Sequence, residues 1–183
     1  MQKLKLPLAI ALGSALSLSS AAAARNPMVG GGAMYPTRNI VQNAVNSKDH
    51  TTLVAAVKAA GLVDTLSSKG PFTVFAPTNE AFAQLPSGTV DTLLKPENKG
   101  TLTGVLTYHV VPGRYTAGQI VALAARSRGV ATLKTVEGEN LRFMKSGPGW
   151  VVVDAKGGKA HITIANVMQS NGVIHVVDRV LMP

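Results

Sequence analysis

Asn171-Gly-Val-Ile-His-Val-Val-Asp-Arg-Val-Leu-Met-Pro183 is the most distinctive stretch of this 183-residue chain. Its first two residues are a strong turn signal, and residues 173–181 are rich in the β-branched side chains that favour strands. Apolar side chains occupy both odd and even positions, so both faces of this strand carry them. We therefore predict an interior strand that is covered on both sides, with the polar ring of His175 in its middle.

The residues before this closing strand have the same β character. Short runs rich in valine, isoleucine, leucine and threonine alternate with glycine or charged residues, and Gly-Pro-Gly at 147–149 is typical of a hairpin break. We predict strands over 130–136, 140–145, 150–154 and 161–167, followed by the closing strand over 173–181.

The first part of the domain shows helical periodicity instead. Apolar residues recur at helical spacing over 40–45 and 53–63, with Asp49 as the expected N-cap and Gly61 as the expected end of the second helix. Further helices are predicted over 79–85, where Thr78 is the expected cap, and over 90–94, 97–108 and 117–125. The last of these begins at the capping-box pair Thr116 and Gln119. A lone strand over 72–76 must join the later sheet, and this segregation predicts an α+β fold.

The N-terminal residues resemble an export signal. Lys3 and Lys5 precede a short apolar stretch, and Ala22 and Ala24 are small residues at the spacing of a cleavage site. We expect a signal peptide over residues 1–24, a flexible glycine-rich tether over 25–38 and a single domain over 39–183. The apolar stretch is too short to span a bilayer, which takes roughly 20 apolar residues, so the chain is not expected to be membrane-spanning.

Composition excludes several classes of function. The chain has no cysteine, so disulfides and thiolate sites are excluded. Its formal net charge is +9, which favours anionic partners weakly. The basic residues are scattered and lack interleaved aromatic residues, so nucleic acid is not expected as a partner.

Three ordered motifs resemble those of the fasciclin family, whose domains are also called FAS1 or beta-Ig-H3 domains. Thr73-Val-Phe-Ala-Pro-Thr-Asn-Glu-Ala-Phe82 is similar to the first family signature, Tyr108-His109 to the central motif and residues 171–183 to the second signature. The family residues are Thr73, Phe75, Pro77, Thr78, Asn79, Phe82, Tyr108, His109, Asn171, Gly172, His175 and Asp178.

This resemblance implies a wedge-like β-sandwich with several helices packed around it and with the two signatures side by side as central strands. It also implies an extracellular adhesion or matrix module. Bacterial members of this kind are exported proteins associated with attachment, biofilm or host contact.

The histidines are interpreted as structural. His175 lies among valines, and a buried histidine must find hydrogen-bond partners or lose its charge. A site made of His109 and His175 would lack the three or four ligands that a metal normally needs, and His50 and His161 are poor additions. No metal and no cofactor are therefore expected.

A candidate interaction segment precedes the closing strand: Asn166, Val167, Met168 and Gln169. Some animal members of the family carry an Asp-Ile integrin-binding pair here, but this chain has Asn166-Val167 and lacks the carboxylate. The resemblance therefore does not carry integrin binding over. We expect the exposed residues of this segment or the outer helices to form the contact surface, although Val167 and Met168 also fit strand core.

The first signature places a hydroxyl next to a carboxylate, at Thr78 and Glu80, but no base completes an active site. We therefore expect a non-enzymatic adhesion or interaction module, periplasmic or extracellular. Its expected partner is a cell-surface or matrix protein or an acidic polysaccharide. The alternative is a carrier of a small apolar ligand, and a hydrolase is the third hypothesis. The sequence leaves the oligomeric state open.

Overall fold

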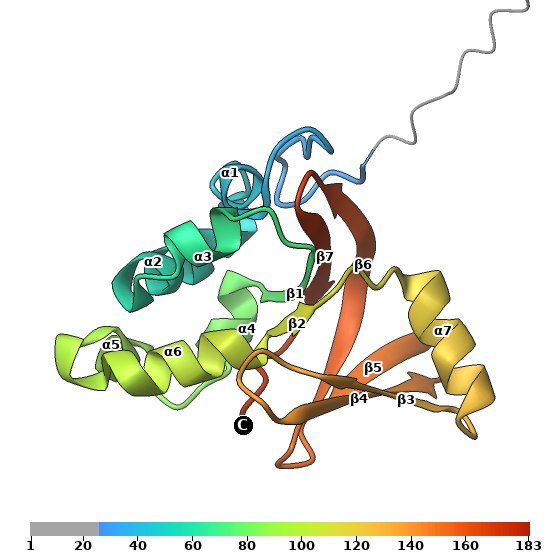
Figure 1. The fold of residues 1–183 in the computed structure, drawn as a ribbon. Coiled ribbons are helices and arrows are strands. Elements are labelled where there is room, and N and C mark those ends of the chain that lie inside the picture. The colour runs from blue at the N-terminus through green and yellow to red at the C-terminus, as the bar shows by residue number, and fades with distance from the viewer. Residues whose placement is uncertain (1–25) are drawn as a thin grey trace, which may run out of the picture.

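The computed structural model describes residues 26–183 (Figure 1). The signal peptide expected over 1–24 lies outside these residues. The helices are α1 (Ile40–Ala44), α2 (Thr51–Ala60), α3 (Val63–Ser67), α4 (Asn79–Ala83), α5 (Thr89–Leu94), α6 (Lys99–Tyr108) and α7 (Ala117–Arg126), with 3-10 turns η1 (Lys48–His50) and η2 (Pro96–Asn98). The strands are β1 (Phe72–Pro77), β2 (Val110–Pro112), β3 (Val130–Lys134), β4 (Asn140–Ser146), β5 (Gly149–Val153), β6 (Lys159–Gln169) and β7 (Gly172–Val177).

The seven strands form one mixed sheet in the order β2-β1-β7-β6-β5-β4-β3. β1 and β7, which hold the two signatures, pair in parallel, with Phe75 opposite His175. The remaining pairs are antiparallel. The lone early strand thus joins the later sheet, as predicted, and β7 lies between β1 and β6 with all six of its residues buried.

The sheet bends along β6, so its two halves face each other in a wedge. The Phe75 ring of β1 lies 5.1 Å from the Phe143 ring of β4, centre to centre. Apolar residues of both halves, together with Ile120 and Ala124 of α7, form one buried cluster in the wedge. This arrangement confirms the α+β class and the sandwich that the family resemblance implied.

The helices α1 to α6 cover the other face of β1 and β7 (Figure 1). Because side chains alternate along a strand, Val74 and Ile174 point to these helices while Phe75 and Val177 point into the wedge. Apolar side chains of α2 and α6, such as Leu53 and Leu106, complete the second cluster. Each central strand therefore contributes to two cores, which explains why its apolar residues are continuous.

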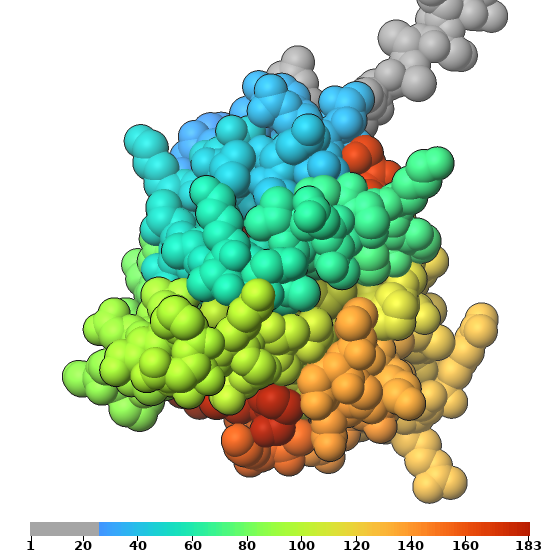
Figure 2. All heavy atoms as spheres, turned by 60° about the vertical axis from the view of Figure 1, so that its left-hand side comes forward, coloured from blue at the N-terminus to red at the C-terminus, as the bar shows by residue number. Residues whose placement is uncertain are grey.

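The N-terminal segment corrects one expectation. A flexible tether was expected over residues 25–38, but Val29 and Met34 are buried in the helix-side core. The Asn26 amide also makes two hydrogen bonds with the backbone of Met168. Figure 2 shows this blue segment packed onto the body of the molecule. The glycines permit tight turns here, and the apolar residues between them anchor the segment.

Most predicted helix caps agree with the structure, but one cap and one strand differ from the prediction. Thr78 and Thr116 cap α4 and α7 as predicted, and Gly61 ends α2 with a φ of 73°. Asp49 is not the cap of α2, because it lies in η1 and makes no capping bond. Instead Asn79 Oδ1, from the first signature, accepts a 3.0 Å hydrogen bond from Thr52 N. Strand β2 was not predicted, since its three residues become a strand only by pairing with β1.

No helix among residues 26–183 combines the length and the apolar character that a membrane span requires.

Candidate functional site

His175 lies in the middle of β7 and is fully buried. Its Nε2 lies 2.8 Å from the carbonyl oxygen of Tyr115, and Asn166 N donates to its Nδ1 over 3.4 Å. The ring also stacks on Phe75, with centres 5.5 Å apart. A carbonyl accepts only, so the proton is on Nε2 and Nδ1 is the acceptor. Burial lowers the pKa of His175, which keeps the ring neutral.

His109 follows α6 and has the opposite tautomer. Its Nδ1 donates to Val105 O over 2.8 Å, and its Nε2 accepts a 3.0 Å hydrogen bond from Leu181 N. A proton on Nε2 would face the Leu181 N–H. Burial lowers the pKa of His109 to about 4, although the Val105 carbonyl and Asp154 act in the opposite direction. His109 thus joins the end of α6 to the chain after β7.

His50 completes a set of three buried histidines. Its Nδ1 lies 2.8 Å from Ser47 Oγ, and its Nε2 lies 3.4 Å from Ala76 O. The carbonyl again fixes the proton on Nε2, so Ser47 donates its hydroxyl proton to Nδ1. Burial lowers the pKa of His50. This serine–histidine pair was not found from the sequence, although their spacing of three residues at a helix start was a usable signal.

Other signature residues also form hydrogen bonds that join separate segments of the fold. Thr73 Oγ1 donates to Gly113 O and accepts from Tyr115 N, over 2.7 and 2.8 Å. The hydroxyl of Tyr108 accepts from Ala155 N over 2.8 Å, and burial raises the pKa of this phenol. Among residues 26–183, no buried side-chain nitrogen or oxygen lacks a hydrogen-bond partner.

Asn171 makes three hydrogen bonds at the start of the closing stretch. Its Oδ1 accepts from Ile40 N over 3.0 Å, and its Nδ2 donates to Leu66 O and Ser68 O over 2.8 and 2.7 Å. The asparagine thereby ties α1 and α3 to β7. Gly172 follows it, and any Cβ there would collide with the Phe72 carbonyl of the neighbouring strand.

Asp178 forms a different kind of contact at the surface. Its Oδ1 accepts from His161 N over 2.7 Å, and its Oδ2 lies 3.1 Å from His161 Nδ1. Within the described part of the chain, no other lysine, arginine or histidine nitrogen lies within 4.0 Å of a carboxylate oxygen. No three histidine, aspartate or glutamate side chains of residues 26–183 lie together as a group that could hold a metal ion.

The candidate interaction segment is less exposed than expected. Val167 is fully buried in the helix-side core, in agreement with its interpretation as strand core, and Gln169 is 2% exposed, so neither residue offers a contact surface. The cause is the irregular pairing of β6 with β7, whose register shifts between Ile164 and Val167 and turns Val167 inward. Gln169 is held by the buried amide of Asn43.

Asn166 and Met168 are the accessible members of the segment. Asn166 is exposed in a left-handed conformation, with a φ of 60°. Its Oδ1 nevertheless accepts a 2.8 Å hydrogen bond from Ala117 N and so helps to cap α7. Met168 is half-buried, and the side chain of Asn26 occupies its backbone groups. The four residues therefore do not form a continuous contact surface.

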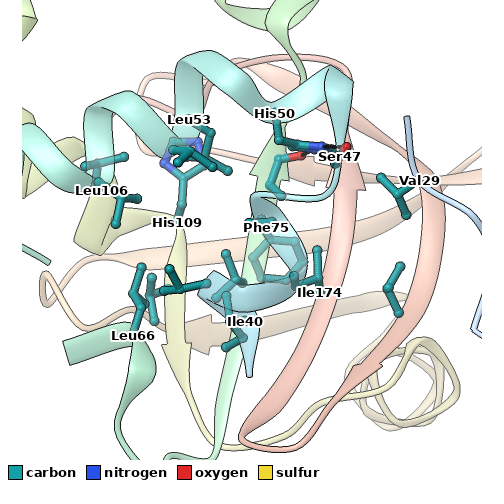
Figure 3. Close-up of a pocket in the computed structure, with 18 of the residues that line it drawn as sticks. Val29, Ile40, Ser47, His50, Leu53, Leu66, Phe75, Leu106, His109 and Ile174 are labelled. Atoms are coloured by element: carbon teal, nitrogen blue, oxygen red, sulfur yellow. Dashed lines mark hydrogen bonds between the residues drawn. The ribbon is translucent and has the colours of Figure 1, made fainter. Parts of the chain in front are cut away.

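An apolar cavity lies between the helices and the sheet (Figure 3). Its volume is about 50 Å³, and Val29, Ile40, Leu53, Leu66, Leu106 and Ile174 are among its lining residues. Ser47, His50 and His109 also line it, but their polar atoms are already paired. The cavity can therefore offer an apolar wall to a small guest but few free hydrogen-bonding groups.

The same signatures occur in known proteins to which this chain is similar. A model described as the fasciclin domain matches residues 48–183. The chain belongs to the fasciclin family. This fasciclin protein is 54% identical over 144 residues to protein sll1483 of Synechocystis sp., covering 79% of this chain and 73% of that protein. It is also 34% identical over 167 residues to the cell surface glycolipoprotein MPB83 of Mycobacterium bovis, covering 88% of this chain and 68% of that one.

A solved structure shares the fold. It is a FAS1 domain pair from the insect cell adhesion molecule Fasciclin I, with a TM-score of 0.71 and 19% identity. The match covers 80% of this fasciclin protein but 51% of that chain, so the protein spans about half of the solved pair. At this identity the likeness establishes the fold alone.

Proposed function

We propose that this fasciclin protein is an exported, non-enzymatic interaction module that attaches to a cell-surface or matrix protein or to an acidic polysaccharide. The observation that carries the proposal is the state of the three buried histidines. Each uses one ring nitrogen as a donor to a carbonyl and the other as an acceptor. None retains a free nitrogen to act as a base or a ligand.

Two further observations support an interaction role at the surface of a cell. The sequence of residues 1–24 resembles a signal peptide. The names of two similar proteins, a cell surface glycolipoprotein and a cell adhesion molecule, refer to that location or role. Within this proposal, residues 1–24 are the leader and residues 39–183 the domain, while residues 26–38 pack against that domain.

A cell-binding assay tests the proposal. Fluorescently labelled protein is incubated with cells of its own host that lack the gene, and bound protein is counted before and after competition with an excess of unlabelled protein. We expect saturable binding and reduced surface attachment of the deletion strain. Non-saturable binding together with normal attachment would contradict the proposal.

The cavity supports a second candidate function, a carrier of a small apolar ligand. Its volume of about 50 Å³ exceeds the roughly 10–15 Å³ that one water needs. It is far below the roughly 300–1,000 Å³ of ordinary ligand pockets. A carried ligand must therefore widen it.

Native mass spectrometry of protein purified from its host tests the carrier function. A co-purifying ligand that is lost when Leu53→Trp fills the cavity supports it. Exposed Val45→Trp is the matched control, because its side chain is 53% exposed and is absent from the cavity lining. A protein mass without any addition contradicts the carrier function.

A further inference from the structure

The net positive charge of the domain comes from one half of the chain. Residues 39–108, which form helices α1 to α6 and strand β1, hold five lysines and five acidic residues. Residues 109–183 hold nine lysines and arginines against four acidic residues. Two of these four are engaged: Asp154 is buried and accepts backbone hydrogen bonds, and Asp178 pairs with His161. The sheet half therefore carries the uncompensated charge.

Within that half, the strands β3, β4, β5 and β6 contain no aspartate or glutamate. Their register places Thr132, Arg142, Val153 and Lys159 in one row across the four strands. Lys134 of β3 lies two residues along from Thr132 and so on the same face. This face is opposite to the one that carries Phe143 and Val152 into the wedge. We call these residues the basic row: Lys134, Arg142 and Lys159.

The three cations of the basic row are exposed and free of carboxylates. None of them lies within 4.0 Å of an acidic oxygen, since His161 with Asp178 is the one ion pair of the described residues. Neighbouring strand backbones are about 4.8 Å apart, so the Cα atoms of Arg142 and Lys159, which lie on either side of β5, are about 10 Å apart. The β5–β6 turn and α4 line a separate open hollow of about 340 Å³, to which Lys156 and Arg179 contribute cations and Asp154 a carboxylate.

We propose that the basic row is the docking surface for an acidic polysaccharide. The inference rests on the proposed interaction function and names its partner class. Three exposed cations on one face of a sheet complement a chain that carries a carboxylate on successive sugars. Thr132 and Asn140, which are exposed on the same face, offer hydrogen bonds to sugar hydroxyl groups.

Other anionic partners fit this face less well. Val151 and Val153 are its large aliphatic residues from β5, and both are buried, at 1% and 4% exposure. The face therefore has no exposed apolar side chain of that strand to insert into a lipid layer. Among the described residues its exposed positions include no phenylalanine, tyrosine or tryptophan ring on which nucleic-acid bases could stack, and the exposed imidazole of His161 is bound to Asp178.

Binding to polygalacturonate, an acidic polysaccharide, tests the inference with protein purified from its host. The test variant carries Lys134→Glu, Arg142→Glu and Lys159→Glu. The control variant carries Lys69→Glu, Lys95→Glu and Lys99→Glu, which change the net charge equally on the helical side, where these lysines are also exposed. Neutral dextran, phosphatidylglycerol vesicles and duplex DNA serve as the other probes.

We expect salt-sensitive binding to polygalacturonate, a loss of about tenfold or more in the test variant and a change of less than about threefold in the control. Equal losses in both variants would overturn the inference, because net charge alone would then explain binding. Tighter binding to vesicles or DNA would also overturn it. If polygalacturonate does not bind while host cells still do, the inference fails and the proposed function stands. If neither binds, both fail.

Discussion

At the scale of single residues, the signatures serve to hold the fold together. His50, His109 and His175 are neutral because each ring has one carbonyl acceptor and one donor around it. Burial supplies the energetic reason, since a charged imidazolium without water or a carboxylate is costly. The ring nitrogens of these histidines, which could act as a base or a metal ligand, are therefore all engaged in hydrogen bonds inside the molecule.

Stability at acid pH follows from this state. The pKa of His109 is about 4 in the folded protein and 6.5 in the reference state. Between these values the unfolded chain binds the extra proton, so the free energy of unfolding falls as the pH decreases from about 6.5 to about 4. His50 and His175, whose pKa values are also lowered, act in the same direction. Stability from these groups is fully present above pH 6.5.

Urea unfolding at pH 7 and pH 4.5 measures this dependence. We expect His109→Gln to lose about 2 kcal/mol less between the two pH values than the unsubstituted protein does. Met28→Ala is the control, because the Met28 side chain is 64% exposed and does not titrate, and its pH profile is expected to follow that of the unsubstituted protein. Parallel profiles for His109→Gln and the unsubstituted protein would show that His109 is protonated equally in both states.

Asn171 gives a second prediction at this scale. Asn171→Ala removes one acceptor and two donors from backbone groups of α1 and α3 that lie next to the core. Unpaired buried groups are costly, so we expect a loss of about 2–4 kcal/mol in the free energy of unfolding. Asn98→Ala removes a single exposed bond to Thr92 O and is expected to cost less than about 1 kcal/mol. Equal effects would contradict the role assigned to Asn171.

At the scale of elements, contacts between distant segments determine what the sequence could and could not predict. The interior position of β7 was predictable because apolar residues at both odd and even positions place apolar side chains on both faces of the strand, and both faces must then be buried. The inward turn of Val167 was not, since it depends on how β6 is shifted against β7. Asn79 as the partner of Thr52 was also beyond local patterns, because 27 residues separate the two.

The N-terminal segment shows the same limit. Its run of glycines predicts flexibility, but Val29 and Met34 are 4% and 7% exposed. We therefore expect the double variant Val29→Ala with Met34→Ala to lose about 3 kcal/mol of stability, because buried apolar side chains are truncated. Thermal unfolding followed by circular dichroism measures it.

Met28→Ala is the matched control for this segment. The Met28 side chain is 64% exposed, so its truncation should change stability by less than about 0.5 kcal/mol. If the double variant were as stable as this control, residues 26–38 would behave as the tether that the sequence suggested.

At the scale of the whole molecule, architecture and charge are divided between the two halves. The helical half is electrically balanced and lines most of the cavity, while the sheet half carries the excess of cations. Three regions could in principle bind a partner: the buried signatures, the cavity and the basic row. The hydrogen bonds of the signatures and the small size of the cavity favour the basic row.

Titration of isotopically labelled protein with polygalacturonate, followed by amide chemical shifts, separates these three regions in one measurement. We predict that the shifts that change most belong to Lys134, Arg142, Lys159 and their neighbours on β3 to β6, with little change along β7. Changes centred on His175 and the closing strand, or on Leu53 and the cavity lining, would contradict the assignment of the signatures to structure and of binding to the basic row.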